Sequence, residues 1–172
     1  MKRVLVVGSC GAGKSTFSRK LQEKTDLPLI HLDRYYWKPD WVESSVEEWT
    51  AKVSELISGD KWIIDGNYGG TMDLRMKRAD TVIWLDLPRY LCIYRVLKRT
   101  LSANSSARPD MAEGCEERFE LDFLKYVWNF RRDKNPKIER RFDRVHEQAR
   151  LIRFRRSSEP MAFLDGLENQ CD

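Results

Sequence analysis

Residues 8–15 constrain this chain more than any other stretch, because they read Gly-Ser-Cys-Gly-Ala-Gly-Lys-Ser and fit the pattern G-x-x-x-x-G-K-[ST] in full. The apolar, β-branched run at residues 3–7 precedes them and is typical of a strand that is covered on both faces. Residues 14–24 follow, with Phe17 and Leu21 at helical spacing. This strand–loop–helix context is what the motif requires, and it predicts an α/β fold that opens with a phosphate-binding loop.

The chemistry of this loop explains its residue types. Glycines permit backbone angles that other residues resist, so that successive N–H groups can turn inward and surround a phosphate. The helix that begins near Lys14 adds the positive end of its dipole. We expect the Lys14 ammonium to contact the β and γ phosphates of a nucleotide, and the Ser15 hydroxyl to bind Mg²⁺.

Strand patterns and helix patterns alternate along the rest of the chain. We expect strands at residues 28–32, 61–64, 81–85 and 151–154, and helices at residues 45–57, 72–78, 88–101, 116–131, 136–147 and 159–167. Alternation of this kind predicts βαβ units, and hence a three-layer α/β/α architecture of the P-loop NTPase class with a five-stranded parallel sheet. At 172 residues, the chain is expected to form a single domain over residues 1–172.

Aspartates stand at three of the predicted strand ends, the edge at which such sheets bind ligands. Asp65 follows an apolar strand and is typical of a second residue that organises Mg²⁺. Asp33 could orient or deprotonate an acceptor hydroxyl, or contact Mg²⁺ through water. The alternative for both is a turn or capping aspartate, which is how we interpret Asp86. Arg75, ten residues after Asp65, is a further candidate for binding an acceptor.

Arginines flank a Ser-, Ala- and Pro-containing loop predicted at residues 102–114. Arg95 and Arg99 lie one helical turn apart before this loop, and Arg131 and Arg132 end the helix after it. Arginines placed in this way could close over a nucleotide and neutralise charge in a transition state. The alternative for each of them is a solvated basic face.

Aromatic residues crowd the segment that follows Asp33, where the sequence contains Tyr35, Tyr36, Trp37 and Trp41. Beside an acceptor site, these rings could stack on a base or another ring. The alternative is that they pack a small helical flap, at about residues 34–58, onto the core.

Charge is unevenly distributed in a chain whose net charge is +4. Residues 131–156 hold 11 Lys and Arg against 4 Asp and Glu, a balance that suits either nucleic acid or a phosphorylated small molecule. The longest early apolar run, residues 4–7, is too short for a membrane span and lacks the form of a signal peptide. We therefore expect a cytoplasmic protein with no membrane partner.

Together these motifs resemble the adenylate kinase-related branch of P-loop kinases. The resemblance rests on the loop at residues 8–15, the turns at 65–66 and 86–88, and the pair Arg95 and Arg99. The fuller pattern, Leu-Asp-Arg-Tyr-Tyr-Trp at 32–37, Ile-Asp-Gly-Asn-Tyr at 64–68 and Arg-Pro-Asp at 108–110, is similar to bacterial proteins labelled DNA topology modulation proteins, which are predicted kinases of that branch.

The resemblance implies ATP with Mg²⁺ and a small helical lid, at about residues 102–135. It implies that the nucleotide phosphates are held by Gly8, Ser9, Gly11, Ala12, Gly13, Lys14, Ser15 and Thr16. It places Arg95 and Arg99 on the helix that leads into the lid, and makes Arg131 or Arg132 a lid-side arginine. After Asp65-Gly66 the chain continues with residues 67–70 as Asn-Tyr-Gly-Gly, where adenylate kinases have Pro-Arg, so AMP is not the expected acceptor.

Two functional hypotheses follow. In the first, the protein is a small-molecule kinase, with Lys14, Asp33, Arg95, Arg99 and Arg131 in catalytic roles and Mg²⁺ on Ser15 and Asp65. In the second, it is a nucleotide-dependent, DNA-associated regulator, whose sequence support is the basic segment. A nucleotide hydrolase or sensor without a transfer reaction is a further alternative.

Overall fold

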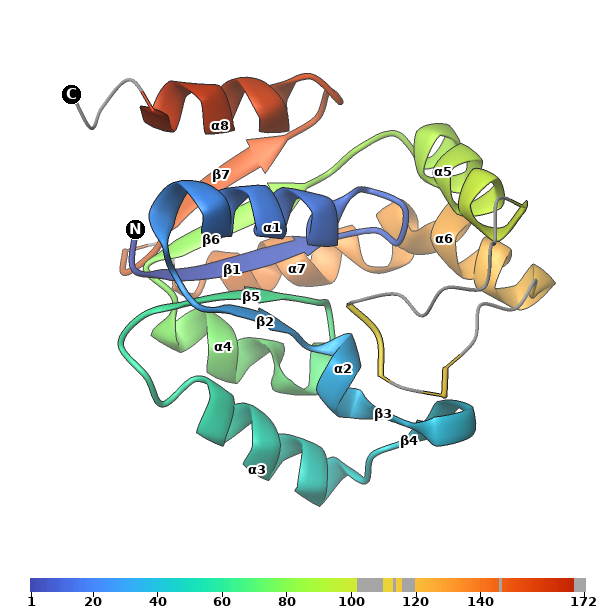
Figure 1. The fold of residues 1–172 in the computed structure, drawn as a ribbon, viewed down its shortest axis with the longest axis horizontal. Helices are drawn as coiled ribbons and strands as arrows, with labels where there is room; N and C mark the ends of the chain where they lie inside the picture. The colour runs from blue at the N-terminus through green and yellow to red at the C-terminus, as the bar shows by residue number, and fades with distance from the viewer. Residues whose placement is uncertain (102–109, 113, 116–119, 146, 169–172) are drawn as a thin grey trace.

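The five main strands form one parallel sheet, in the spatial order β2-β5-β1-β6-β7 (Figure 1). The computed structural model describes residues 1–172 except 102–109, 113, 116–119, 146 and 169–172. The strands are β1 (Arg3–Gly8), β2 (Leu29–His31), β5 (Trp62–Asp65), β6 (Thr81–Leu85) and β7 (Arg150–Phe154). The predicted three-layer fold with a five-stranded parallel sheet is therefore confirmed.

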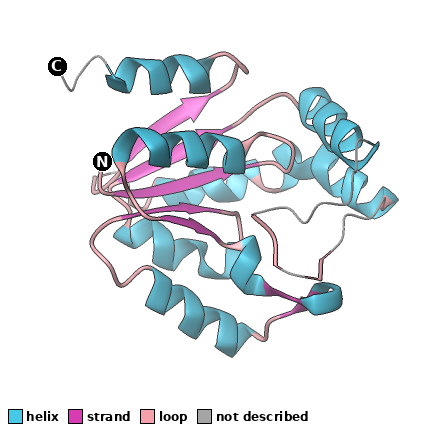
Figure 2. Cartoon of the chain, viewed as in Figure 1, coloured by secondary structure: helices cyan, strands magenta, loops and turns pink. Residues whose placement is uncertain are grey.

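Helices cover both faces of this sheet (Figure 2). They are α1 (Lys14–Thr25), α2 (Asp33–Tyr36), α3 (Val46–Leu56), α4 (Met72–Arg78), α5 (Arg89–Leu101), α6 (Leu121–Asp133), α7 (Asn135–Phe142) and α8 (Glu159–Glu168). Successive side chains of β1 alternate between the two faces. Val4 and Val6 pack with α1, α5 and α8, whereas Leu5 and Val7 pack with α3, α4 and α7.

Several elements agree closely with the sequence predictions. The helix at 72–78 and the strand at 81–85 have the predicted bounds. Ser45, the first residue of the helix predicted at 45–57, is the N-cap of α3 and forms a capping box with Glu48. The described part of the helix predicted at 116–131 begins at Leu121, and the one predicted at 136–147 ends at Phe142.

The segment predicted as a flap contains elements that sequence periodicity does not reveal. After α2 come the two-residue strands β3 (Trp37–Lys38) and β4 (Val42–Glu43), paired antiparallel around the 3₁₀ turn η1 (Pro39–Trp41). A second 3₁₀ turn, η2 (Gly69–Thr71), precedes α4. Much of the segment predicted as a lid lies outside the described residues.

None of the described helices combines the length and the apolar character that crossing a membrane requires.

Candidate functional site

The loop between β1 and α1 has the backbone shape that its glycines allow. Gly8, Gly11 and Gly13 have φ angles of 149°, 78° and 92°, a region that side-chain-bearing residues rarely adopt. A Cβ on Gly8 would lie 2.6 Å from the carbonyl oxygen of Leu85, and one on Gly11 would overlap the carbonyl oxygen of Cys92. The loop is therefore packed against β6 and α5, and both glycines are sterically required.

Charged side chains lie along the same loop. The Lys14 ammonium donates to the carbonyl oxygens of Gly8 (3.0 Å) and Ser9 (3.1 Å), which holds it over the loop. Arg95 Nη1 donates to the carbonyl oxygen of Ala12 at 3.3 Å, so α5 places one predicted arginine directly on the loop. Arg99 is half-buried one turn further along α5.

The first turn of α1 carries Ser15, which is half-buried, and Thr16, which is exposed. Ser9 belongs to the loop itself, where its hydroxyl is buried.

Asp65 lies at the end of β5, on the sheet face that α1 covers. Its neighbour Ile63 packs in the α1 cluster, and side chains two apart along a strand share a face. Asp65 Oδ1 is 3.0 Å from His31 Nδ1, and both residues are buried. Asp65 Oδ2 is also buried and has no hydrogen-bond partner among the described residues.

The donor set on this face fits Mg²⁺. A buried carboxylate oxygen without a partner is costly, and it is relieved by a cation or by a water that a cation holds. Ser15, in the first turn of α1, offers a second oxygen, and oxygen ligands are those that Mg²⁺ prefers.

Asp33 begins α2, just beyond the end of β2, and is bonded to Tyr68. The Tyr68 hydroxyl donates to Asp33 Oδ1 through a short hydrogen bond. Burial of the phenol, followed by the charge and hydrogen bond of Asp33, raises the pKa of Tyr68 far above its ordinary value, against a smaller lowering by a hydrogen bond with Trp37. Tyr68 therefore stays protonated and acts as a hydrogen-bond donor that orients this carboxylate.

The aromatic residues of the flap form a cluster with rings from other elements. Tyr36 lies 5.0 Å from Trp37, 5.0 Å from Trp49 and 4.5 Å from Tyr68, measured between ring centroids. Trp37 in turn contacts Trp41 at 5.3 Å. These rings therefore pack α2 and the β3–β4 hairpin onto α3 and the loop after β5. For this segment the structure favours packing of the flap over stacking of the rings on a ligand. Tyr35, in contrast, is exposed.

The flap also contacts the described end of the lid segment. The backbone N–H of Asp40 donates to the carbonyl oxygen of Gly114 at 3.3 Å, and the Cys115 thiol donates to the carbonyl oxygen of Lys38 at 3.4 Å. The two segments that the sequence places on opposite sides of the site therefore touch at this point.

The loop after β5 is joined to the phosphate loop by Asn67. Its Oδ1 accepts from the Gly8 N–H at 3.1 Å, and its Nδ2 donates to the Gly8 carbonyl at 2.8 Å. Tyr68, the next residue, has a φ of 29°, which is strained for a residue other than glycine. Two adjacent residues, Asn67 and Tyr68, thus connect Gly8 to Asp33.

Arg75 supports this loop from beneath, and the prediction that it binds the acceptor is wrong. It is fully buried, and its guanidinium donates to the carbonyl oxygens of Gly66 (2.8 Å), Asn67 (2.6 Å) and Tyr68 (2.7 Å). Burial lowers the pKa of Arg75 to about 9. Its charge is therefore used to hold three successive carbonyl groups and is unavailable to a ligand.

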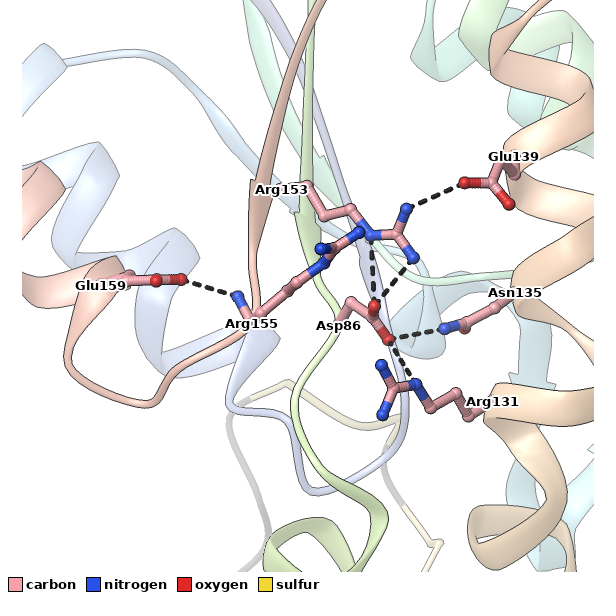
Figure 3. Close-up of polar contacts among 7 residues, drawn as sticks. All are labelled: Asp86, Arg131, Asn135, Glu139, Arg153, Arg155 and Glu159. Atoms are coloured by element: carbon pink, nitrogen blue, oxygen red, sulfur yellow. Dashed lines mark hydrogen bonds and ion pairs between the residues drawn. The ribbon is translucent and has the colours of Figure 1, made fainter.

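Asp86 is the centre of a buried ionic network and not a helix cap (Figure 3). Its Oδ2 accepts from Arg153 at 2.9 and 3.1 Å, and its Oδ1 accepts from Asn135 at 2.6 Å. Arg153 also bonds Glu139 at 2.9 Å and lies 3.9 Å above the Trp84 ring. The turn interpretation failed because the partners of Asp86, Arg153 on β7 and Asn135 on α7, are distant from it in the sequence.

The structure separates the two arginines at the end of α6. Arg131 Nε lies 3.6 Å from Asp86 Oδ1, beside the end of β6 (Figure 3). Arg132 forms an exposed pair with its neighbour Asp133 at 2.7 Å. Arg131 is therefore the one directed towards the carboxyl edge of the sheet. Arg132 belongs to a solvated basic face, which was the alternative for each of these arginines.

Sequence reasoning missed the contacts of Asn67 and His31. An Asn that follows Asp-Gly at a strand end was the available signal for Asn67, since such an amide can pair with a backbone peptide unit. For His31, which lies inside a strand pattern, no sequence signal indicated its pairing with Asp65.

Comparison with known proteins gives structural matches only. No protein family matches the sequence, and no curated protein matches it. A shikimate kinase from Acinetobacter baumannii, solved in complex with shikimate, superposes with a TM-score of 0.62 at 15% identity, over 99% of this chain and 94% of that one. A shikimate kinase from Aquifex aeolicus gives a TM-score of 0.54 at 15% identity, over 98% of both chains. The chain therefore has the fold seen in shikimate kinases over nearly its whole length, which agrees with the expected P-loop NTPase fold.

Proposed function

We propose that this protein is an ATP-dependent kinase of the P-loop class that transfers a phosphoryl group to a small-molecule acceptor. The observation that carries the proposal is the physical link between two half-sites. Asn67 bonds the phosphate loop at Gly8, and the adjacent Tyr68 bonds Asp33. A phosphate-binding loop and an oriented carboxylate are thereby held at the same edge of the sheet. Likeness to the fold of shikimate kinases supports the same class of reaction.

The phosphate side of the site consists of the loop amides and three groups around them. The N–H groups of residues 8–16 hold the triphosphate, and Lys14 leaves its carbonyl partners to contact the β and γ phosphates. Ser15 and, through water, Asp65 hold Mg²⁺, which neutralises charge on the transferring phosphoryl group when it is bound. Arg95 contacts the loop from α5, and Arg131 on α6 lines a small pocket together with Ser9 of the loop, so both add positive charge near it.

Asp33 serves the acceptor side. The acceptor hydroxyl oxygen forms a bond to the γ-phosphorus as the bond from that phosphorus to the β–γ bridging oxygen breaks, and ADP leaves with the electron pair. Asp33 accepts the hydroxyl proton, and Tyr68 keeps the carboxylate in position. We propose a small hydroxylated compound as the acceptor, because the Asp33 carboxylate can accept a hydroxyl proton, and because Tyr68, which bonds it, belongs to a cluster of aromatic rings that suits a compact ring.

The basic segment that suggested a DNA-associated regulator is engaged in part in internal contacts. Of its eleven Lys and Arg residues, Arg131 and Arg153 bind Asp86, Arg132 binds Asp133, and Arg141 binds Asp73. These four side chains are thereby less available to the phosphates of DNA. The structural matches are to small-molecule kinases and offer no support for that alternative.

A screen for acceptor-dependent release of ADP tests the proposal. Nucleosides, nucleoside monophosphates and small cyclic polyols are each supplied with Mg·ATP. Transfer to one acceptor class is expected, and Lys14→Ala should lower kcat/KM by about 10²–10³-fold, as for loss of a transition-state donor. Asp33→Asn should lower kcat by about 10²-fold or more. Lys20→Ala, on the outer part of α1, is the matched control and should retain activity.

Two outcomes would contradict the proposal. The first is that Mg·ATP fails to bind the folded protein. The second is that ATP is hydrolysed at one rate whatever acceptor is added, and that this rate is the same in Asp33→Asn.

A further inference from the structure

A surface pocket of about 380 Å³ lies beside α4 and α7, away from the candidate site. Its lining residues are Asp73, Lys77, Arg141, Arg144, Val145 and Gln148. Three of these six side chains are cationic and one is anionic, so the pocket has a formal charge of +2. A concave site with an excess of two positive charges favours a dianion.

One cation of the pocket is fixed in place. Arg141 Nε donates to Asp73 Oδ2 at 3.2 Å, and its Nη2 donates to the carbonyl oxygen of Gly69 at 3.0 Å. Neither bond involves Nη1. Because the only carboxylate of the lining is paired with Arg141, the exposed Lys77 and Arg144 contribute the excess charge. A guanidinium that is already immobilised loses little conformational entropy when it binds an anion.

The pocket is separate from the phosphate loop. Val145, its apolar wall, belongs to the buried cluster on the α3–α4–α7 face, whereas α1 packs on the opposite face of the sheet. The two sites are nevertheless connected through the loop after β5. Arg141 binds the carbonyl oxygen of Gly69, and Arg75 binds the carbonyl oxygens of the three preceding residues, 66–68. The loop at residues 66–69 is thus fixed from two helices.

We propose that this pocket binds a small phosphate-bearing anion, as a second anion site independent of the kinase reaction. The phosphate contacts Arg141, Lys77 and Arg144 through charge-assisted hydrogen bonds, and the remainder of the ligand lies against Val145 and Gln148. Free phosphate and a phosphorylated small molecule share this chemistry.

Calorimetric titration with inorganic phosphate tests the proposal, at an ionic strength held constant with chloride. The background is Lys14→Ala, which weakens binding at the phosphate loop. Phosphate should still bind this variant at one equivalent, in the pocket beside α4 and α7. Adding Lys77→Gln and Arg144→Gln should weaken this binding tenfold or more. The control pair Lys137→Gln and Arg140→Gln removes the same charge from the exposed side of α7 and should change Kd by less than about twofold.

Equal weakening by the two pairs would overturn the proposal, since it would indicate the general charge of the surface. Absence of phosphate binding to folded Lys14→Ala would do the same. In the unmodified protein, phosphate should shift the backbone amide resonances of Lys77, Val145 and Gln148, and shifts confined to residues 8–16 would refute the site. Titration with glucose 6-phosphate then separates the two sources: tighter binding than phosphate indicates a phosphorylated small molecule, and weaker binding indicates free phosphate. None of these measurements depends on transfer activity, so the proposed kinase function can fail while this site stands.

Discussion

Replacement of Asn67 tests the link between the two halves of the site. The Asn67 amide makes two hydrogen bonds to the peptide groups of Gly8, at 3.1 and 2.8 Å. In Asn67→Ala the Gly8 carbonyl keeps its bond from Lys14, so only the Gly8 N–H loses every partner that the structure gives it. With about 0.5–1.5 kcal/mol for each lost bond, and water entering the space, we expect the free energy of unfolding to fall by about 1–2 kcal/mol.

Asn67→Leu sharpens this prediction. The leucine side chain has nearly the same size, so it keeps water from the Gly8 N–H that it leaves unpaired. An unsatisfied buried donor costs about 1–3 kcal/mol, and the leucine variant should therefore be less stable than the alanine variant by about 1 kcal/mol. A simple effect of side-chain volume predicts the opposite order, because leucine fills the space that alanine leaves open.

Urea unfolding at pH 7 measures both variants, with the slope of the transition required to stay constant so that midpoints report stability. Asn129→Ala on α6 removes the same atoms elsewhere and is the control. In the transfer assay, Asn67→Ala should retain its KM for ATP within about threefold and lose about tenfold or more in kcat, because the loop at residues 66–69, which holds Asp33 through Tyr68, is displaced. Wild-type stability in Asn67→Leu would refute the reasoning.

Three further predictions concern the framework of the site. Gly11→Ala should lower the free energy of unfolding by about 2–5 kcal/mol, through backbone strain and overlap with Cys92. Gly13→Ala should lower it by about 1–2 kcal/mol, because the atom nearest to the new Cβ is 3.7 Å away. Urea unfolding measures both variants, and equal losses would contradict the packing argument. Arg75→Lys should cost about 3 kcal/mol in the same assay, since an ammonium cannot reach three carbonyl groups, and a loss below about 1 kcal/mol would show that the guanidinium is dispensable. Burial raises the pKa of Asp80, but hydrogen bonds from Thr81 and from the backbone N–H groups of residues 3 and 2 outweigh it and hold this pKa below its usual value. The carboxylate thus stabilises the fold above about pH 4, and this contribution disappears as the pH falls. Asp80→Asn should therefore lower the free energy of unfolding by about 1 kcal/mol at pH 7 and differ little from wild type at pH 3. A difference that stays constant with pH would contradict the assignment.

Local patterns predicted the main elements because each element has its own signal. The buried strand at 81–85 is a short apolar run before Asp-Leu-Pro, and α3 begins at a Ser with Glu three residues later. The β3–β4 hairpin has no such signal. Its strands are two residues long, and its turn contains Asp40 and Trp41 at positive φ, which only the contacts around it can maintain.

The predicted site was least accurate where a charged side chain is buried and supports the fold. Arg75 has the residue type of a ligand contact but donates to the carbonyl groups of residues 66–68, and Asp86 has the residue type of a helix cap but binds Arg153, far away in the sequence. Within the phosphate loop, in contrast, the spacing of the glycines depends on the local backbone alone. Gly8, Gly11 and Gly13 have the positive φ angles that the motif requires.

The position of β1 in the middle of the sheet has a consequence for how the chain folds. Both neighbours of β1 come from beyond residue 60, and the second of them, β6, begins at Thr81, so the strand that leads into the phosphate loop acquires its full set of hydrogen bonds only after about half the chain is available. Pairing over such long separations slows folding and leaves an apolar segment exposed to aggregation in the meantime. A nascent chain that ends before β6 would therefore carry the complete nucleotide motif in its sequence and still lack the rigid backbone that the motif needs.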